Sequence, residues 1–105
     1  MLRIYSVALE CTVALRPVLA AVESKDSDLG RQMRRAIQSV PLNIAEGSSS
    51  RGRNRAARYH TAAGSMKEVI ACVDVAVALG YLGEVDAELV DRLHRVVNTL
   101  KKLVL

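Results

Sequence analysis

Residues 39–47 read SVPLNIAEG and lie inside an otherwise continuous helical pattern. Apolar residues recur at spacings of three and four before, within and after this stretch, at Leu29, Met33, Ile37, Val40 and Ile44. That spacing is typical of one apolar helix face. The pattern keeps its phase at Pro41, although a proline inside a helix costs about 3 kcal/mol when nothing compensates. It therefore predicts one helix that continues through the proline and ends near residues 47–50.

Polar residues share this stretch with the apolar stripe. Asn43 and Glu46 lie three apart on one helix face, and Ser65 and Glu68 repeat that spacing later in the chain. If the two segments are antiparallel neighbours, these groups meet, and the favoured interpretation is a hydrogen-bonded network that fixes helix register. The predicted structural motif comprises Ser39, Pro41, Asn43, Glu46, Gly47, Gly64, Ser65 and Glu68.

A catalytic interpretation of the same residues is weaker. Glu46 and Glu68 could be paired carboxylates for acid–base chemistry or for a metal, as in helical bundles that hold two metal ions. Those bundles use Glu-x-x-His, and neither His60 nor His94 lies at that spacing from either glutamate. We therefore expect no metal site, no cofactor and no enzyme activity.

Four helical segments are predicted, over about residues 2–23, 28–47, 55–80 and 86–104. Asp26 or Ser27 is the expected N-cap of the second segment and Asn54 that of the third, while Gly80 suits a C-terminal cap. The polar stretch SSSRGRN, residues 48–54, is the clearest loop. The pattern predicts an all-α fold, an antiparallel up-down-up-down four-helix bundle in a single domain over residues 1–105. The alternative is a helical hairpin that completes its core only in a dimer.

The first segment has little polar surface. Arg3, Glu10, Pro17 and Ser24 fall seven apart and form one narrow stripe, and nearly everything else is apolar. Surface helices of monomers normally have a much wider polar face. This helix is either buried by its own chain or, as we favour, forms a subunit interface. Pro17 is expected to bend it.

The same segment bears on location. No run reaches 18 uninterrupted apolar residues, so a membrane span is not expected. Glu10 and Arg16 interrupt the short apolar run that otherwise resembles a signal peptide. Cys11 and Cys72 lack the spacing of a redox or metal motif, and we expect two buried free thiols rather than a disulfide or a metal site. Together these features predict a cytoplasmic protein.

Positive charge is concentrated in one part of the chain. The formal net charge is +4, and seven arginines fall within residues 31–58, where Glu46 is the only acid. Guanidinium groups suit bidentate contacts with phosphate. No aromatic stacking platform accompanies them, so sequence-specific reading of single strands is not expected. The predicted nucleic-acid-binding residues are Arg31, Arg34, Arg35, Arg51, Arg53, Arg55 and Arg58.

A longer stretch resembles a known family. QMRRAIQSVPLNIAEGSSSRGRNRAARYHTAAGSMKEV, residues 32–69, followed by LGYL at 79–82, is similar to bacterial four-helix-bundle proteins first noticed as reading frames in intervening sequences of large-subunit ribosomal RNA genes. Ile70 stands where family members often carry a second acid, and Tyr59 is the nearest aromatic to their usual phenylalanine. The resemblance implies a compact bundle that assembles into a homo-oligomeric ring, a pentamer. It also implies kinship with accessory proteins of diversity-generating retroelements, which are basic pentamers that bind nucleic acid and a reverse transcriptase.

Three functions follow as hypotheses. The leading one is a non-enzymatic, homo-oligomeric scaffold that binds nucleic acid through its arginines, with structured RNA as the favoured ligand. The alternative is a protein-interaction module that docks a partner such as a reverse transcriptase and has no direct nucleic-acid role. The third, a hydrolase that uses Glu46 and Glu68, lacks any nucleophile–base pair, phosphate loop or cofactor motif in the sequence.

Overall fold

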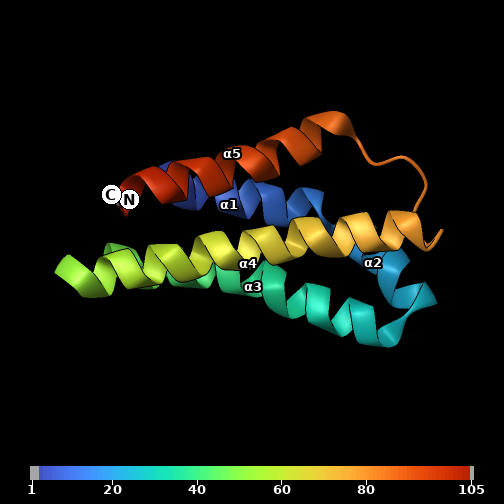
Figure 1. Cartoon of the computed structure of the whole chain (residues 1–105), viewed down its shortest axis with the longest axis horizontal. Helices are drawn as coiled ribbons and strands as arrows, with labels where there is room; N and C mark the ends of the chain where they lie inside the picture. Colours follow the sequence, from blue (N-terminus) through green and yellow to red (C-terminus); the bar gives the residue numbers. More distant parts are fainter. Residues whose placement is uncertain (1–2, 105) are drawn as a thin grey trace.

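The computed structural model describes residues 3–104, in which five α-helices follow one another and no strand occurs. The all-α prediction is confirmed. The helices lie side by side in an elongated bundle of 42 × 25 × 20 Å, with the start of α1, the end of α5 and the α3–α4 turn at one end (Figure 1). The helices are α1 (Arg3–Ala14), α2 (Arg16–Lys25), α3 (Ser27–Ser48), α4 (Gly52–Ala78) and α5 (Ala87–Leu103).

The packing of these helices places each beside its neighbours in sequence. α3 packs along α4 and α4 along α5, while α1 contacts both α3 and α5 and α2 packs mainly on α3. Gln32 bonds to Glu68 and, further along α3, Ser39 bonds to Ser65, so α3 and α4 run in opposite directions. The core between the helices is built from Val, Leu, Ile, Met and Ala, with residues such as Met33, Ile44 and Leu100 fully buried.

The predicted first segment is two helices rather than one. α1 and α2 meet at Leu15 with a bend of 45°, just before Pro17 in the first turn of α2. Proline has no N–H to donate to the carbonyl four residues earlier, which explains a break at this point. The predicted start at Leu2 lies outside the described residues. Among residues 3–104 no single helix is both long and apolar enough to cross a membrane; α1 and α2 meet the length and composition criteria only as a bent pair.

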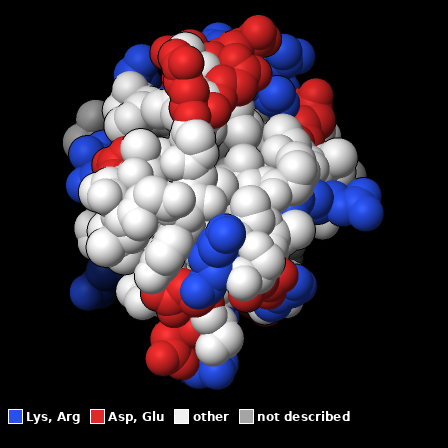
Figure 2. Space-filling view, turned by 90° about the vertical axis from the view of Figure 1, so that its right-hand side faces the viewer, with Lys and Arg blue, Asp and Glu red and all other residues white. Residues whose placement is uncertain are grey.

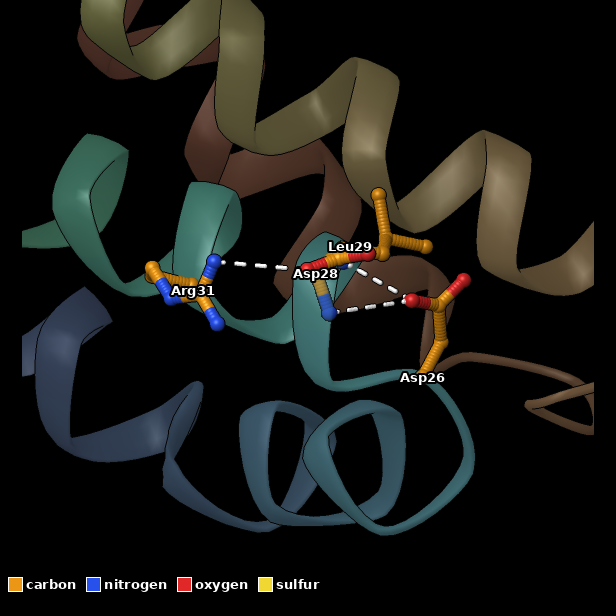
Figure 3. A network of polar contacts seen from close by, with 4 residues as sticks. All are labelled: Asp26, Asp28, Leu29 and Arg31. Atoms are coloured by element: carbon orange, nitrogen blue, oxygen red, sulfur yellow. Dashed lines mark hydrogen bonds and ion pairs between the residues drawn. The ribbon is translucent and has the colours of Figure 1, made fainter.

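The predicted helix through SVPLNIAEG is present. α3 continues across Pro41, which is buried, and ends at Ser48. Its N-cap is Asp26, whose Oδ1 accepts hydrogen bonds from the amides of Asp28 at 3.1 Å and Leu29 at 3.0 Å (Figure 3). The Tyr81 hydroxyl donates to the other Asp26 oxygen at 3.2 Å. Asp26 therefore joins the α2–α3 junction to the α4–α5 connection.

The start of α4 differs from the prediction. The helix begins at Gly52 instead of about residue 55, and its N-cap is Arg51. Asn54 is not the cap, because its side-chain amide donates to the Ser50 hydroxyl at 3.0 Å. Gly52 has a φ of 57°, a left-handed conformation that glycine adopts without strain, and this shortens the turn between the helices. The other end agrees with the sequence, since Gly80 has a φ of 79° just beyond α4.

Both cysteines are buried and unpaired, as predicted. Cys11 lies in α1 and Cys72 in α4, with exposed fractions of 0% and 3%. Burial raises the pKa of both thiols, because it disfavours the thiolate. Neither is therefore poised as a nucleophile.

The junction of α2 and α3 makes stability sensitive to acid. The hydrogen bond from Arg34 lowers the pKa of Glu23, and the backbone amide of Leu29 lowers that of Asp26. Because the folded pKa lies below the unfolded one in both cases, each carboxylate stabilises the folded state above its ordinary pKa. That contribution is lost as the pH falls through the folded pKa values.

We therefore expect a Glu23→Gln/Asp26→Asn variant to melt at a lower temperature than the parent near neutral pH. The difference should shrink as the pH falls below about 4, where the parent carboxyl groups also become protonated. Thermal unfolding followed by circular dichroism across this pH range measures it. A difference in melting temperature that stays constant with pH would contradict the assignment.

Candidate nucleic-acid interface

The seven predicted arginines fall into two separate groups. Three lie in the first turns of α3, and four lie at the α3–α4 turn and in the first turns of α4. About 20 Å of helix separates Arg35 from the end of α3, at about 1.5 Å per residue. The structure therefore does not bring the whole predicted set onto one surface.

The first group is largely paired within the chain. Arg34 forms a two-pronged ion pair with Glu23, with Nε–Oε2 and Nη2–Oε1 distances of 2.9 and 3.0 Å. This pair ties α2 to α3 and raises the pKa of Arg34. The Nη1 atom of Arg31 lies 3.3 Å from Oδ1 of Asp28. Figure 3 draws this ion pair. Of these three arginines, Arg35 alone is exposed with no side-chain hydrogen bond or ion pair to residues 3–104.

Arg55 has a structural position in the second group. Its Nε donates to the carbonyls of Gly47 at 3.1 Å and Ser50 at 2.9 Å, and a terminal nitrogen reaches the Ser48 carbonyl at 3.4 Å. A cation is favourable at the C-terminus of a helix, where carbonyls lack partners. We therefore assign Arg55 to the closure of α3 rather than to ligand binding.

Arg51, Arg53 and Arg58 form what we call the basic tip. All three are exposed, and none of their side chains makes a hydrogen bond or ion pair with residues 3–104. They surround the start of α4, where Arg51 provides no side-chain cap. The first amides of a helix need acceptors and form the positive end of its dipole, so cations at Arg51 and Arg53 are unfavourable there, and Arg58 lies about two turns further along α4. A bound anion such as phosphate would satisfy all of these groups.

A second basic feature lies further along the bundle, about 22 Å of helix from the start of α4. Lys67 on α4 lies beside Lys101 on α5, and the neighbouring Lys67 lowers the pKa of Lys101. Such an effect requires two like charges held close together. The two lysines are 34 residues apart, so no local sequence pattern could have linked them.

The predicted structural motif comes together in part. The hydroxyls of Ser39 and Ser65 are 2.7 Å apart, and the Asn43 side-chain amide donates to the Ser39 carbonyl at 2.9 Å and to its hydroxyl at 3.0 Å. This network crosses between α3 and α4 beside Pro41. Glu46 is exposed and outside it.

The two glutamates are not a pair. Glu68 accepts a hydrogen bond from Gln32 at 3.2 Å. Glu46 lies 14 residues further along α3, about 20 Å away. The paired-carboxylate interpretation is therefore wrong. Among residues 3–104 no group of three or more His, Cys, Asp or Glu side chains is placed to hold a metal ion.

The remaining motif residues are the two glycines. Gly47 is buried against the ring of Tyr59, where a Cβ atom would lie 2.5 Å from the Tyr59 Cε1. Gly64 is exposed in the middle of α4, and a Cβ there would meet no atom within 4 Å. Close packing thus explains why position 47 is glycine. No contact within the described chain explains the glycine at position 64.

Comparison with known proteins identifies a family and a solved structure with the same fold. The model of a family described as 23S rRNA-intervening sequence protein matches residues 1–103. Among solved structures, a crystal structure of a protein of unknown function from the S23 ribosomal protein family of Bacteroides thetaiotaomicron VPI-5482 matches with a TM-score of 0.72. The match covers 96% of this chain and 94% of that one at 15% identity, so it shows a shared fold. No curated protein matches the sequence.

Proposed function

Since the chain belongs to the 23S rRNA-intervening sequence protein family, we propose that it is a non-enzymatic, homo-oligomeric scaffold that binds nucleic acid, structured RNA in the first place. In this proposal the subunit is an antiparallel four-helix bundle, with α1 and α2 counted as one bent helix. The subunits assemble into a ring, a pentamer.

The basic tip is the observation that supports binding. Arg51, Arg53 and Arg58 are unpaired cations around helix amides that lack a side-chain cap. Helix N-termini bind phosphate through such amides, and guanidinium groups add charge-assisted hydrogen bonds. None of these contacts reads a base, so recognition rests on the shape and charge of the backbone.

Assembly would multiply these contacts. Each subunit offers one basic tip, and a ring places several copies on the same side. Weak phosphate contacts then combine, because each later contact is made at a high effective concentration. Exposed apolar side chains on α1 and α3, namely Leu9, Val13 and Leu42, support self-association.

A salt titration tests the binding proposal. We compare a hairpin RNA and a DNA duplex for binding to the parent chain and to an Arg51→Gln/Arg53→Gln/Arg58→Gln variant. Each phosphate contact contributes about 0.7–0.9 to the slope of log affinity against log salt concentration, so losing three should lower the slope by about 2 per bound subunit. Arg55 is left intact because its loss would disturb the end of α3.

The matched control removes the same charge elsewhere. Arg16, Lys25 and Arg31 are exposed and lie toward the α2–α3 end of the molecule, away from the basic tip. A variant with glutamine at these three positions should retain the parent slope. The proposal would be rejected if the basic-tip variant kept the parent slope of log affinity against log salt concentration. It would also be rejected if the control variant lost as much slope as the basic-tip variant.

The exposed apolar residues also favour a second candidate, a protein-docking module without a nucleic-acid role. A reverse transcriptase is one such partner. This function predicts that a protein partner still co-purifies with the chain after washing at high salt and nuclease treatment. The basic-tip variant should retain that partner.

A further inference from the structure

The end of the molecule opposite the basic tip holds an apolar pocket. At the 45° bend, α2 leaves the line of α1, and residues 82–86 between α4 and α5 lie over the resulting space. The pocket has a volume of about 450 Å³. Its apolar lining is contributed by Ala14, Pro17, Val18, Leu82, Val85 and Leu89.

Acidic side chains border this pocket. Glu84, Asp86 and Glu88 lie on its rim, and Arg92 is its one basic lining residue. Glu84 and Glu88 are exposed and form no ion pair within residues 3–104. Figure 2 views this end of the molecule and shows acidic side chains gathered at its upper edge, with basic ones beside them, above an uncharged band; basic and acidic side chains lie below that band.

Further apolar surface lies close in sequence to the pocket. Val75, Val77 and Leu79, at the end of α4 that leads into the pocket, are 45%, 44% and 57% exposed. A pocket of this volume falls within the usual range of binding pockets, about 300–1,000 Å³. An apolar anchor side chain that enters such a pocket, surrounded by a charged rim, is a common arrangement in protein interfaces.

Charge decides the class of occupant. An acidic rim repels phosphate, so nucleic acid does not fit this end. A second copy of the chain fits less well. Its exposed Leu9 and Leu42 have Glu10 and Glu46 close by, and Leu103, although it follows two lysines, is the one large exposed apolar side chain in the described part of α5 and so forms no apolar face. The basic tip carries the right charge but offers no large apolar side chain, since residues 48–54 are SSSRGRN.

We propose that this acid-rimmed pocket docks a basic, amphipathic segment of another protein, with one of its large apolar side chains inserted beside the α1–α2 bend. Basic residues of that segment pair with Glu84 and Glu88. The site is independent of nucleic-acid binding, because it lies at the other end of a 42 Å molecule. Both ends are therefore free to be occupied at once.

The test uses synthetic helical peptides and the isotope-labelled full chain. The first peptide carries Phe and Leu on one face and Lys on the other; a second has Glu in place of Lys, and a third has Ser in place of Phe and Leu. We expect only the first to bind, with amide shifts confined to residues 14–18 and 79–92. A hairpin RNA should leave these amides unshifted and should not displace the peptide.

Two variants probe the pocket and its rim separately. Gly83→Trp fills the mouth without strain, because a Cβ there meets no atom within 4 Å. Glu84→Gln/Glu88→Gln removes rim charge, and its matched control is Glu46→Gln/Asp74→Asn, which removes the same charge elsewhere. Removing two exposed ion pairs should weaken binding by about twofold to thirtyfold, while the control should leave it unchanged.

Several results would overturn this assignment. One is that the basic amphipathic peptide does not bind, and another is that it shifts amides outside the pocket. Unchanged affinity in both the Gly83→Trp and the rim variants would also reject it. Pocket shifts that depend on protein concentration alone would identify a second copy as the occupant, and pocket shifts with RNA would identify nucleic acid.

Discussion

Replacing Gly47 by alanine is expected to lower the free energy of unfolding by about 1–2 kcal/mol, although alanine is the better helix former. The new Cβ would lie 2.5 Å from Cε1 and 2.7 Å from Cδ1 of Tyr59. The ring is only 2% exposed and has no free space to move into. Overpacking of this kind costs about 1–3 kcal/mol, and the gain in helix propensity of about 1 kcal/mol offsets only part of it.

Gly64→Ala is the matched control, and it should change the free energy of unfolding in the opposite direction. Gly64 also lies inside a helix, but a Cβ there meets open space. Only the gain in helix propensity from glycine to alanine remains, so the free energy of unfolding should rise by about 1 kcal/mol. Thermal unfolding measures both variants, and 1 kcal/mol corresponds to about 4–8 °C in a domain of this size.

A double-mutant cycle shows whether Tyr59 is the cause. Leucine at position 59 is smaller and more flexible than tyrosine, so it leaves room for the alanine Cβ. Gly47→Ala should therefore cost less in a Tyr59→Leu background, with a coupling energy of at least about 0.5 kcal/mol. Strictly additive effects, or a stabilising Gly47→Ala, would show that the ring and this glycine do not constrain each other.

Position 47 also shows what the sequence could and could not predict. The phase of the apolar stripe through Pro41 predicted that α3 continues, because a helix face is a local, periodic property. The meeting of Ser39, Asn43 and Ser65 followed from spacing on two antiparallel helices. The sequence pattern did not reveal why position 47 is glycine, because the contact of Gly47 with Tyr59 depends on how closely α3 and α4 approach each other.

The arginines were harder to interpret for a related reason. Seven of them are close in sequence, but the 13 residues of α3 that follow Arg35 separate the two groups in space. Composition could not show that Arg34 and Arg55 are occupied by internal contacts while Arg51, Arg53 and Arg58 are free. Conversely, Lys67 and Lys101 are distant in sequence and adjacent in the fold.

The apolar character of the first segment leads to the largest expected effect, the loss of assembly. Val13 and Leu42 are 61% and 65% exposed. Val13 lies on α1 and Leu42 on α3, and these two helices contact each other.

A Val13→Glu/Leu42→Glu variant is expected to be a monomer under conditions in which the parent chain forms a homo-oligomer. Full burial of such a side chain in an interface stabilises by about 1.5–3 kcal/mol, and a carboxylate at the same place must instead be desolvated. Light scattering at micromolar concentration measures the mass, which should fall by a factor equal to the number of subunits. Circular dichroism should show unchanged helix content, because both positions face outward.

The control for this variant places the same charges on another surface, at the end of α4 and just beyond it. Val77 and Leu79 are exposed to a similar degree, at 44% and 57%, so Val77→Glu/Leu79→Glu changes net charge and surface hydrophobicity equally. It should retain the parent mass if assembly uses the α1–α3 surface. A parent chain that is monomeric, or a Val13→Glu/Leu42→Glu variant that keeps the oligomeric mass, would reject this surface. A monomeric parent would also remove the multivalency on which the proposed RNA affinity depends, because each basic tip would then bind phosphate alone.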